Sequence, residues 1–146
     1  MSLLPWRANV AAASGEPCVY CVIDAGALLE LLLRGLREAA VRAAVDNRQL
    51  VAPAVIDAEI LSALRGLERI SAVSAVRAAQ AIQDLQVAPV ERYPLAPLLD
   101  RAWGLRDKLP AYDALYVALA VRLNCPLITT DDRIPSPRLP ASVIIA

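Results

Sequence analysis

The chain of 146 residues has the length of one domain, and 58% of its residues are hydrophobic, so it can bury a core and is not intrinsically disordered. No apolar run approaches the roughly 18 residues that a membrane-spanning helix needs. The 15 basic and 15 acidic residues balance, and His is absent. These numbers exclude transmembrane proteins, His-dependent nucleophilic triads and His-containing zinc motifs.

Residues 1–17 carry two prolines and scattered polar side chains without periodicity, which predicts a flexible N-terminal tail ahead of a domain at residues 18–146. A secretory signal would need an apolar stretch of roughly 7–15 residues, and residues 10–13 are too few. We therefore expect a cytoplasmic protein with no membrane partner.

The first half of the domain alternates short β-branched runs with helical periodicity. Gly35 is expected to separate two helices, and Pro53 is suited to the first turn of another. The predicted elements are a strand at 19–23, helices at 25–34 and 36–45, a strand at 49–52 and a helix at 53–69.

The second half continues the alternation, with Ser71 as a helix cap and Pro89 marking a strand near a sheet edge. The predicted elements are a helix from 71 to about 86, a strand at 87–90, an amphipathic helix at 95–108, a helix at 111–123 that is apolar all round from 114 to 121, and strands at 126–130 and 142–145. Strands alternating with helices predict an α/β fold, a three-layer α/β/α sandwich with a mainly parallel central sheet.

Cys18 and Cys21 form a C-x-x-C pair, but they lie in or beside a predicted strand, where residues three apart point to opposite faces. A redox pair would open a helix, and a zinc ion would lack a fourth ligand even with Cys125. We expect buried thiols in a reducing compartment.

Two predicted strands end in an acid, Asp24 and Asp131, and functional sites of parallel sheets form beyond the carboxyl ends of the strands. The two carboxylates share one rim if these strands are neighbours. Asp113 lies in the first turn of the apolar helix. It either complements the helix dipole, worth about 0.3–1 kcal/mol, or faces a bound cation that offsets its desolvation.

A fourth acid is expected on the helix that begins near residue 53. Asp57 and Glu59 stand about 160° apart around its axis, so only one can face a given cleft. Glu59 shares its side with Ser62, Arg65 and Arg69, a polar strip suited to phosphates, and is preferred, although spacing alone does not decide.

Four segments together resemble a PIN domain, and most closely the VapC-type toxins of bacterial toxin–antitoxin pairs. They are V-I-D-A-G at 22–26, P-A-V-I-D-A-E-I-L-S-A-L-R at 53–65, Y-D-A-L-Y-V-A-L-A at 112–120 and L-I-T-T-D at 127–131. The resemblance covers roughly residues 19–145, and the last two segments are its specific part.

The resemblance implies a metal-dependent endoribonuclease toxin that cleaves RNA, is inhibited by a cognate antitoxin and forms a homodimer. Its acidic quartet and neighbouring hydroxyl map onto Asp24, Glu59, Asp113, Asp131 and Thr129. Independently of the family, four carboxylates without His or Cys form an oxygen site suited to Mg²⁺ or Mn²⁺, which clamps a phosphate and activates water. Asp24 and Asp113 are the expected direct ligands, Glu59 and Asp131 complete the shell directly or through water, and Thr129 orients one of them.

One departure from the family pattern is Gly26, where relatives usually carry Ser or Thr, so we expect the loss of a hydrogen bond that orients Asp24 or a metal-bound water. This feature keeps a non-catalytic PIN-fold adaptor as the alternative. Asp132 is a second candidate beside Asp131. A phosphoryl acceptor at Asp24 is disfavoured because D-x-D and a suitably placed Lys are lacking.

The arginines and the leucine-rich helices predict which surfaces contact RNA and protein partners. Arg65, Arg69 and Arg133 are the nearest candidates by sequence for RNA contacts. The helices at 25–45 and 53–69 carry more apolar residues than one face can bury, which predicts an interface for a second copy or an antitoxin segment. The leucines in question are Leu28, Leu29, Leu31, Leu32, Leu33 and Leu36.

Overall fold

The computed structural model describes residues 18–134 and 139–146, so the predicted N-terminal tail lies outside the described residues and the boundary at residue 18 stays a prediction. The strands form one sheet in which every neighbouring pair is parallel. This arrangement confirms the α/β fold. In spatial order the strands are β3 (Val90–Tyr93), β2 (Gln49–Pro53), β1 (Tyr20–Ile23), β4 (Leu127–Thr129) and β5 (Val143–Ile145).

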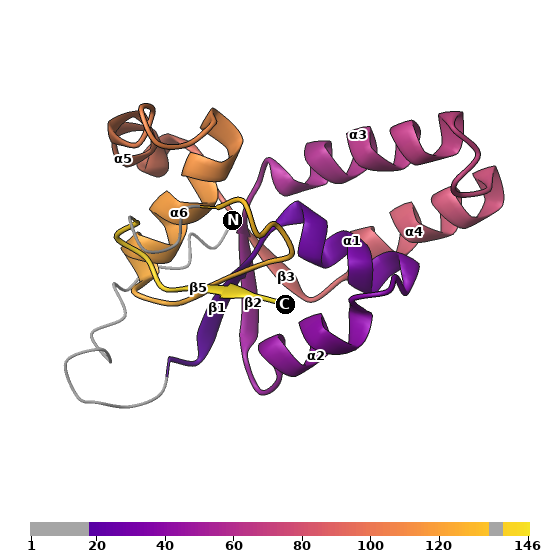
Figure 1. Cartoon of the computed structure of the whole chain (residues 1–146), viewed down its shortest axis with the longest axis horizontal. Helices are drawn as coiled ribbons and strands as arrows, with labels where there is room; N and C mark the ends of the chain where they lie inside the picture. Colours follow the sequence, from indigo (N-terminus) through magenta and orange to yellow (C-terminus); the bar gives the residue numbers. More distant parts are fainter. Residues whose placement is uncertain (1–17, 135–138) are drawn as a thin grey trace, which may run out of the picture.

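Helices lie on both faces of the sheet (Figure 1). α6 (Ala111–Leu123) packs on β1 and β2, and the short α5 (Leu99–Gly104) packs against α6. α1 (Ala25–Leu33) and α2 (Glu38–Val45) contact β4 from the other side.

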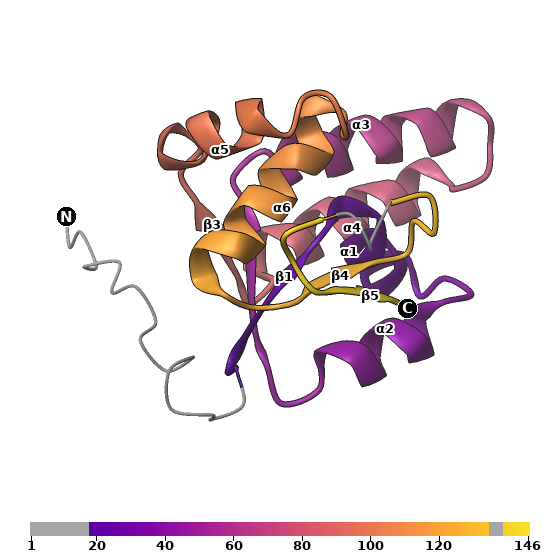
Figure 2. The ribbon, with the colours of Figure 1, turned by 60° about the vertical axis from the view of Figure 1, so that its left-hand side comes forward.

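The remaining two helices extend the layer formed by α1. α3 (Ile56–Arg69) and α4 (Ala75–Val87) both contact α1 and lie side by side as a helical hairpin, seen in Figures 1 and 2. The hairpin places the first turn of α3 beside the first turn of α1, close to the carboxyl ends of the strands.

α6 is the central helix of the core. Every residue from Ala114 to Ala120 is buried, as the apolar run predicts. The strand residues on which it packs are also fully buried: Val22, Ile23, Leu127 and Ile128 have no exposed surface. The only charged group in the first turn of α6 is Asp113, which therefore stands at the margin of an apolar body.

Two predicted boundaries around α3 and α4 are wrong. Pro53 ends β2, and α3 begins later, at Ile56. Ser71 does not cap α4, because it takes a left-handed conformation with φ of 58° after α3. The cap is Ser74, whose hydroxyl accepts a 3.2 Å hydrogen bond from the Arg77 N–H.

The strand predicted at 87–90 is also displaced. Val87 still belongs to α4, and β3 begins at Val90, immediately after Pro89. Pro cannot donate to a sheet ladder, so it precedes the strand instead of lying within it. β3 is nevertheless the sheet edge that Pro89 indicates.

The long helix predicted at 95–108 is wrong. The segment forms a single 3₁₀ turn (Ala96–Leu98) and then α5, which ends at Gly104. Leu98 is buried, whereas Leu99 and Trp103 are 55% and 69% exposed. The apolar periodicity here marks a partly uncovered surface and not a buried helix face.

The leucines of the first helical segment mostly face the core. Leu28 and Leu32 are buried, and only Leu36 among them is fully exposed. The predicted surplus therefore fills the interior more than it covers the surface. Within the described residues, no helix is both long and apolar enough to cross a bilayer.

The three thiols are free. Cys21 and Cys125 are buried as expected, and burial raises their pKa values to about 11 and about 12. Cys18 is only half-buried.

Candidate functional site

Two carboxylates lie at one rim of the sheet because β1 and β4 are neighbours. Val22 pairs with Leu127 and Ile23 with Ile128, so both strands end at the same level. Asp24 follows β1 directly and caps α1, its Oδ1 accepting a 2.8 Å hydrogen bond from the Ala27 N–H. Asp131 follows β4 after one intervening residue.

Thr129 joins these two acids. Its side chain is completely buried at the end of β4. The Thr129 hydroxyl donates to the Asp24 carboxylate and accepts a 2.9 Å hydrogen bond from the Asp131 N–H. A single hydroxyl therefore fixes the side chain of one acid and the backbone of the other.

Burial is the largest influence on Asp24 and raises the pKa of its carboxyl group. The hydrogen bonds from Thr129 and Ala27 oppose the shift, while the charges of Asp113 and Asp131 add to it. Asp24 thus lies where negative charge is already concentrated, and a cation placed there would lower the energy of its ionised form.

Asp113 reaches the same region from the first turn of α6. Burial raises the pKa of its carboxyl group, the charge of Asp131 adds to the shift, and Arg133 opposes it. The Pro110 cap supplies no side-chain acceptor to the N–H groups of the first turn of α6, which lie beside this acid.

Glu59 extends from the first turn of α3 toward the same acids. Its Oε1 accepts a 2.7 Å hydrogen bond from the Tyr116 hydroxyl of α6. Burial raises the pKa of Glu59, the bond from Tyr116 opposes this, and the charges of Asp113 and Asp24 reinforce it. Glu59 therefore lies within electrostatic reach of both Asp113 and Asp24.

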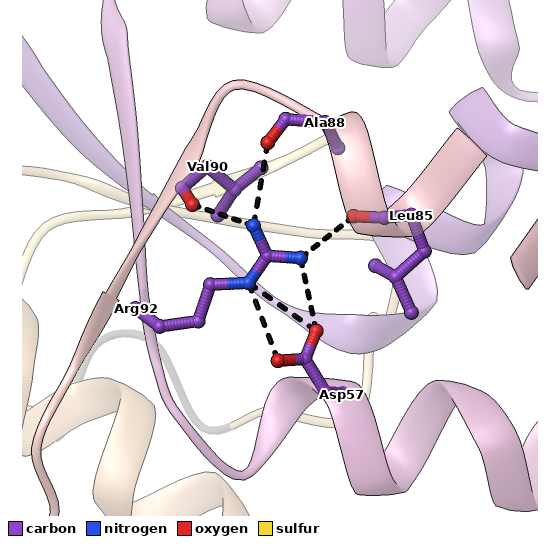
Figure 3. Close-up of polar contacts among 5 residues, drawn as sticks. All are labelled: Asp57, Leu85, Ala88, Val90 and Arg92. Carbon is purple, nitrogen blue, oxygen red and sulfur yellow. Dashed lines mark hydrogen bonds and ion pairs between the residues drawn. The ribbon is translucent and has the colours of Figure 1, made fainter. Parts of the chain in front are cut away.

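Asp57 turns to the opposite side of α3 and meets Arg92 of β3 (Figure 3). The closest of these contacts joins Arg92 Nη2 to Asp57 Oδ1 at 3.0 Å. The same guanidinium donates to three carbonyl oxygens around the end of α4, those of Leu85, Ala88 and Val90. Asp57 is therefore a structural partner of an arginine, and Glu59 is the acid that the fold turns toward the others.

Asp131 is held by a cation in this structure. Arg133 Nε and Nη2 contact its two carboxylate oxygens at 2.9 Å each, and these bonds lower the pKa of Asp131. Asp113, Asp131 and Arg133 line a cleft of about 280 Å³ together with Lys108 and hydrophobic residues. Asp132, the other acid at this position, is exposed.

The donor chemistry of the cleft fits a hard divalent cation. The four candidate ligands offer only carboxylate oxygens, which suit Mg²⁺ or Mn²⁺. Three of them have pKa values raised partly by one another, a repulsion that such an ion relieves. Within residues 18–134 and 139–146, however, no three acidic or thiol side chains already form a closed metal-binding group, and Asp131 is paired with Arg133.

Gly26 lies in a crowded place beside Asp24. A Cβ atom at this position would stand 3.0 Å from Thr130 Oγ1 and 3.6 Å from Asp24 Oδ1. The Thr130 hydroxyl therefore approaches the space that a side chain at residue 26 would fill. Although residue 26 itself has no hydroxyl, the hydroxyl of Thr130, which follows β4, lies near this position.

One residue of the site is not predicted from the sequence. Tyr116 lies within an apolar helix, and its only sequence signal is its place one turn after Asp113, on the same side of α6. Arg133, a candidate RNA contact, pairs with Asp131 in this structure. Arg65 and Arg69 are exposed on α3, about 9 Å and 15 Å along the helix from Glu59.

Comparison with known proteins gives one family and one fold. Residues 21–138 match the model of the PIN domain. Ribonuclease VapC3 of Mycobacterium tuberculosis (strain ATCC 25618 / H37Rv) is 41% identical over 124 residues, which cover 84% of this chain and 90% of that protein.

Two solved structures share the fold at low identity. PAE2754 from Pyrobaculum aerophilum superimposes with a TM-score of 0.65 at 20% identity, covering 86% of this chain and 83% of that one. A toxin–antitoxin complex from Klebsiella pneumoniae contains a chain with a TM-score of 0.60 at 18% identity, covering 85% of this chain and 95% of that one.

Proposed function

Given that the chain belongs to the PIN-domain family and is a relative of the mycobacterial VapC ribonucleases, we propose that it is a toxin that cleaves RNA phosphodiester bonds with Mg²⁺ or Mn²⁺. The observation that carries this proposal is the shared rim of β1 and β4, which sets Asp24 and Asp131 beside Asp113 and within reach of Glu59. The raised pKa values of three of these acids support a cation-binding role.

The residues divide the work in this proposal. Asp24 and Asp113 hold the ion directly, and Glu59 and Asp131 complete its shell directly or through water. Thr129 keeps Asp24 in place through its hydroxyl. The bound ion supplies polarisation of the scissile phosphate and a lowered pKa for water at the site.

Arg133 has two roles in the proposal. It neutralises Asp131 in the free protein, and it lines the cleft together with Lys108, where it can bind an RNA phosphate. An arginine is suited to this exchange because its planar guanidinium binds carboxylates and phosphates with the same paired geometry.

The proposed partners are RNA, a cognate antitoxin and a second copy of the chain, all in the cytoplasm. The pairing of Arg133 with Asp131 supports an antitoxin whose basic residue enters the cleft and competes for the same carboxylates. Exposed Leu99, Trp103 and Tyr112 near a pocket of about 450 Å³ support a homodimer through α5 and α6. A clean monomer in light scattering at tens of micromolar would contradict the dimer.

RNA cleavage in the presence and absence of EDTA tests the function. Purified protein is incubated with structured RNAs in Mg²⁺ or Mn²⁺, beside Asp24→Asn and the control Asp57→Asn. We expect cleavage that EDTA stops, that Asp24→Asn lacks and that Asp57→Asn retains. Cleavage that persists in EDTA would contradict the metal mechanism, and RNA bound but uncut would favour the adaptor.

A further inference from the structure

Tyr116 is the one residue with a side-chain hydroxyl in the second and third turns of α6, where all its neighbours are apolar. Its side chain is 2% exposed. A phenylalanine would fill almost the same volume, so packing alone does not require the hydroxyl. A buried hydroxyl costs free energy unless it is hydrogen-bonded, and its partners therefore indicate what it does.

Both sides of the Tyr116 hydroxyl are engaged. Its proton goes to Glu59 Oε1 at 2.7 Å, and its oxygen accepts from the Ala25 N–H. Ala25 is the first residue of α1, so its N–H has no acceptor within that helix. The phenol thereby connects α6, the first turn of α3 and the residue that follows Asp24.

This connection fixes a side chain that would otherwise be loose. Glu59 has several rotatable bonds, and no cation among the described residues pairs with it. Its neighbours by charge are Asp113 and Asp24, which repel it. Without the Tyr116 hydroxyl, the carboxylate gains freedom to turn away from those acids toward water.

We propose that Tyr116 is a positioning residue of the nuclease site, whose hydroxyl holds the Glu59 carboxylate toward Asp24 and Asp113 so that it can complete the shell of the divalent ion. The inference rests on the proposed function. It adds a sixth side chain to the four acids and Thr129, and this side chain touches neither RNA nor metal and acts through Glu59.

The test combines Tyr116→Phe, Glu59→Gln and the double variant, measured by calorimetric titration with Mn²⁺ and by RNA cleavage. We expect Tyr116→Phe to weaken Mn²⁺ binding and to lower kcat by roughly 10-fold, with KM for RNA unchanged, as for other groups that orient metal ligands. In the Glu59→Gln background the same change should have no further effect, because the carboxylate through which it acts is gone.

Tyr93→Phe is the matched control. Tyr93 is 1% exposed, and its hydroxyl accepts a 2.6 Å hydrogen bond from Arg122 Nε near the far end of α6. This variant should lose stability to a similar degree and keep the Mn²⁺ affinity and kcat of the parent. A crystal structure of Tyr116→Phe should show Glu59 rotated from its present position.

The outcomes separate the two proposals. If the parent protein binds Mn²⁺ and cleaves RNA while Tyr116→Phe matches it, or if the losses from Tyr116→Phe and Glu59→Gln multiply, the positioning role is wrong and the nuclease stands. If the parent neither binds Mn²⁺ nor cleaves RNA, the proposed function is wrong and the inference falls with it.

Discussion

Two carboxylates only two residues apart on α3 have opposite surroundings. Asp57 meets a guanidinium whose other protons go to backbone carbonyls around the end of α4. Glu59 meets a phenol and the repulsion of two further acids. The negative charge of Asp57 is compensated by a cation, whereas the negative charge of Glu59 lies near two further negative charges.

Asp57 is thus a residue that stabilises the folded state, whereas Glu59 belongs to a group of acids that destabilise it. The Asp57–Arg92 pair joins α3 to β3, and Arg92 also donates to carbonyl oxygens at the end of α4 and the start of β3. Asp24, Glu59 and Asp113 have raised pKa values, partly because of the charges of neighbouring acids, and they return no such benefit to the folded state. Substitution of Asp57 should therefore lower stability and spare activity, whereas substitution of the acids at the site should lower activity and spare stability.

The largest expected effect is on activity. Asp24→Asn and Asp113→Asn each remove a candidate ligand charge at nearly constant volume, and we expect cleavage to fall by about 100-fold or more. Asn still caps a helix well, so Asp24→Asn should unfold at no lower urea concentration than the parent. RNA cleavage is measured by an activity assay, and stability is measured by urea unfolding followed by circular dichroism. A variant that lost both cleavage and stability would contradict the assignment of these acids to the site alone.

Asp57→Asn should show the reverse pattern. Removing its charge leaves the half-buried Arg92 guanidinium short of a partner, and we expect a loss of about 1–2 kcal/mol in the free energy of unfolding, given that Asp57 is partly exposed. Cleavage per folded molecule should stay within a factor of two of the parent, roughly the scatter of such assays. If Asp57→Asn abolishes cleavage and Glu59→Gln does not, the assignment of the two acids is reversed.

A smaller effect should depend on pH. The pKa of Asp113 is higher in the folded protein than its usual 3.8, so its ionised form opposes folding above that raised value. Asp113→Asn should be more stable than the parent at pH 7 by less than about 1 kcal/mol, since the group is only partly buried. The gain should vanish as the pH falls below 3.8, where the carboxyl group is protonated in both states. Urea unfolding at pH 7 and near pH 3.5 tests this, and a gain that grew on acidification would have the wrong sign.

The smallest effect concerns the contact between Gly26 and Thr130. Alanine at residue 26 improves helix propensity, but its Cβ would crowd Thr130 Oγ1 at 3.0 Å. Gly26→Ala should therefore be more favourable in a Thr130→Ala background than in the parent, by about 0.5 kcal/mol. Unfolding of the four proteins in this cycle gives the coupling, and additive effects would show that the hydroxyl moves aside without cost.

The fold class and the shared rim of Asp24 and Asp131 could be predicted from the sequence because both depend on local patterns. Strands that end in Asp24 and Asp131 and a wholly apolar helix after Asp113 can be recognised from residue order alone. The choice of Glu59 over Asp57 needed the partner of each, and Arg92 lies 35 residues beyond Asp57 in a strand whose predicted position was wrong. Pairings at that distance follow from packing, which local periodicity does not encode.

The errors lie where side-chain chemistry is ambiguous. Ser71 and Ser74 are equally good caps by type, and backbone conformation decides between them. The segment around Trp103 has helical periodicity, but Leu99 and Trp103 remain exposed beside a pocket of about 450 Å³. Tyr116 was missed because one hydroxyl hardly changes an apolar pattern.

The pairing of β1 with β4 has a consequence for synthesis of the chain. These strands lie about 100 residues apart in sequence, so the acid-bearing rim depends on one of the most distant contacts in the protein. A nascent chain that has emerged only as far as α6 carries three of the four acids but lacks the strand that brings Asp131 to Asp24. Under the proposed function, chains that end before β4 lack the assembled site, and such fragments are expected to be inert.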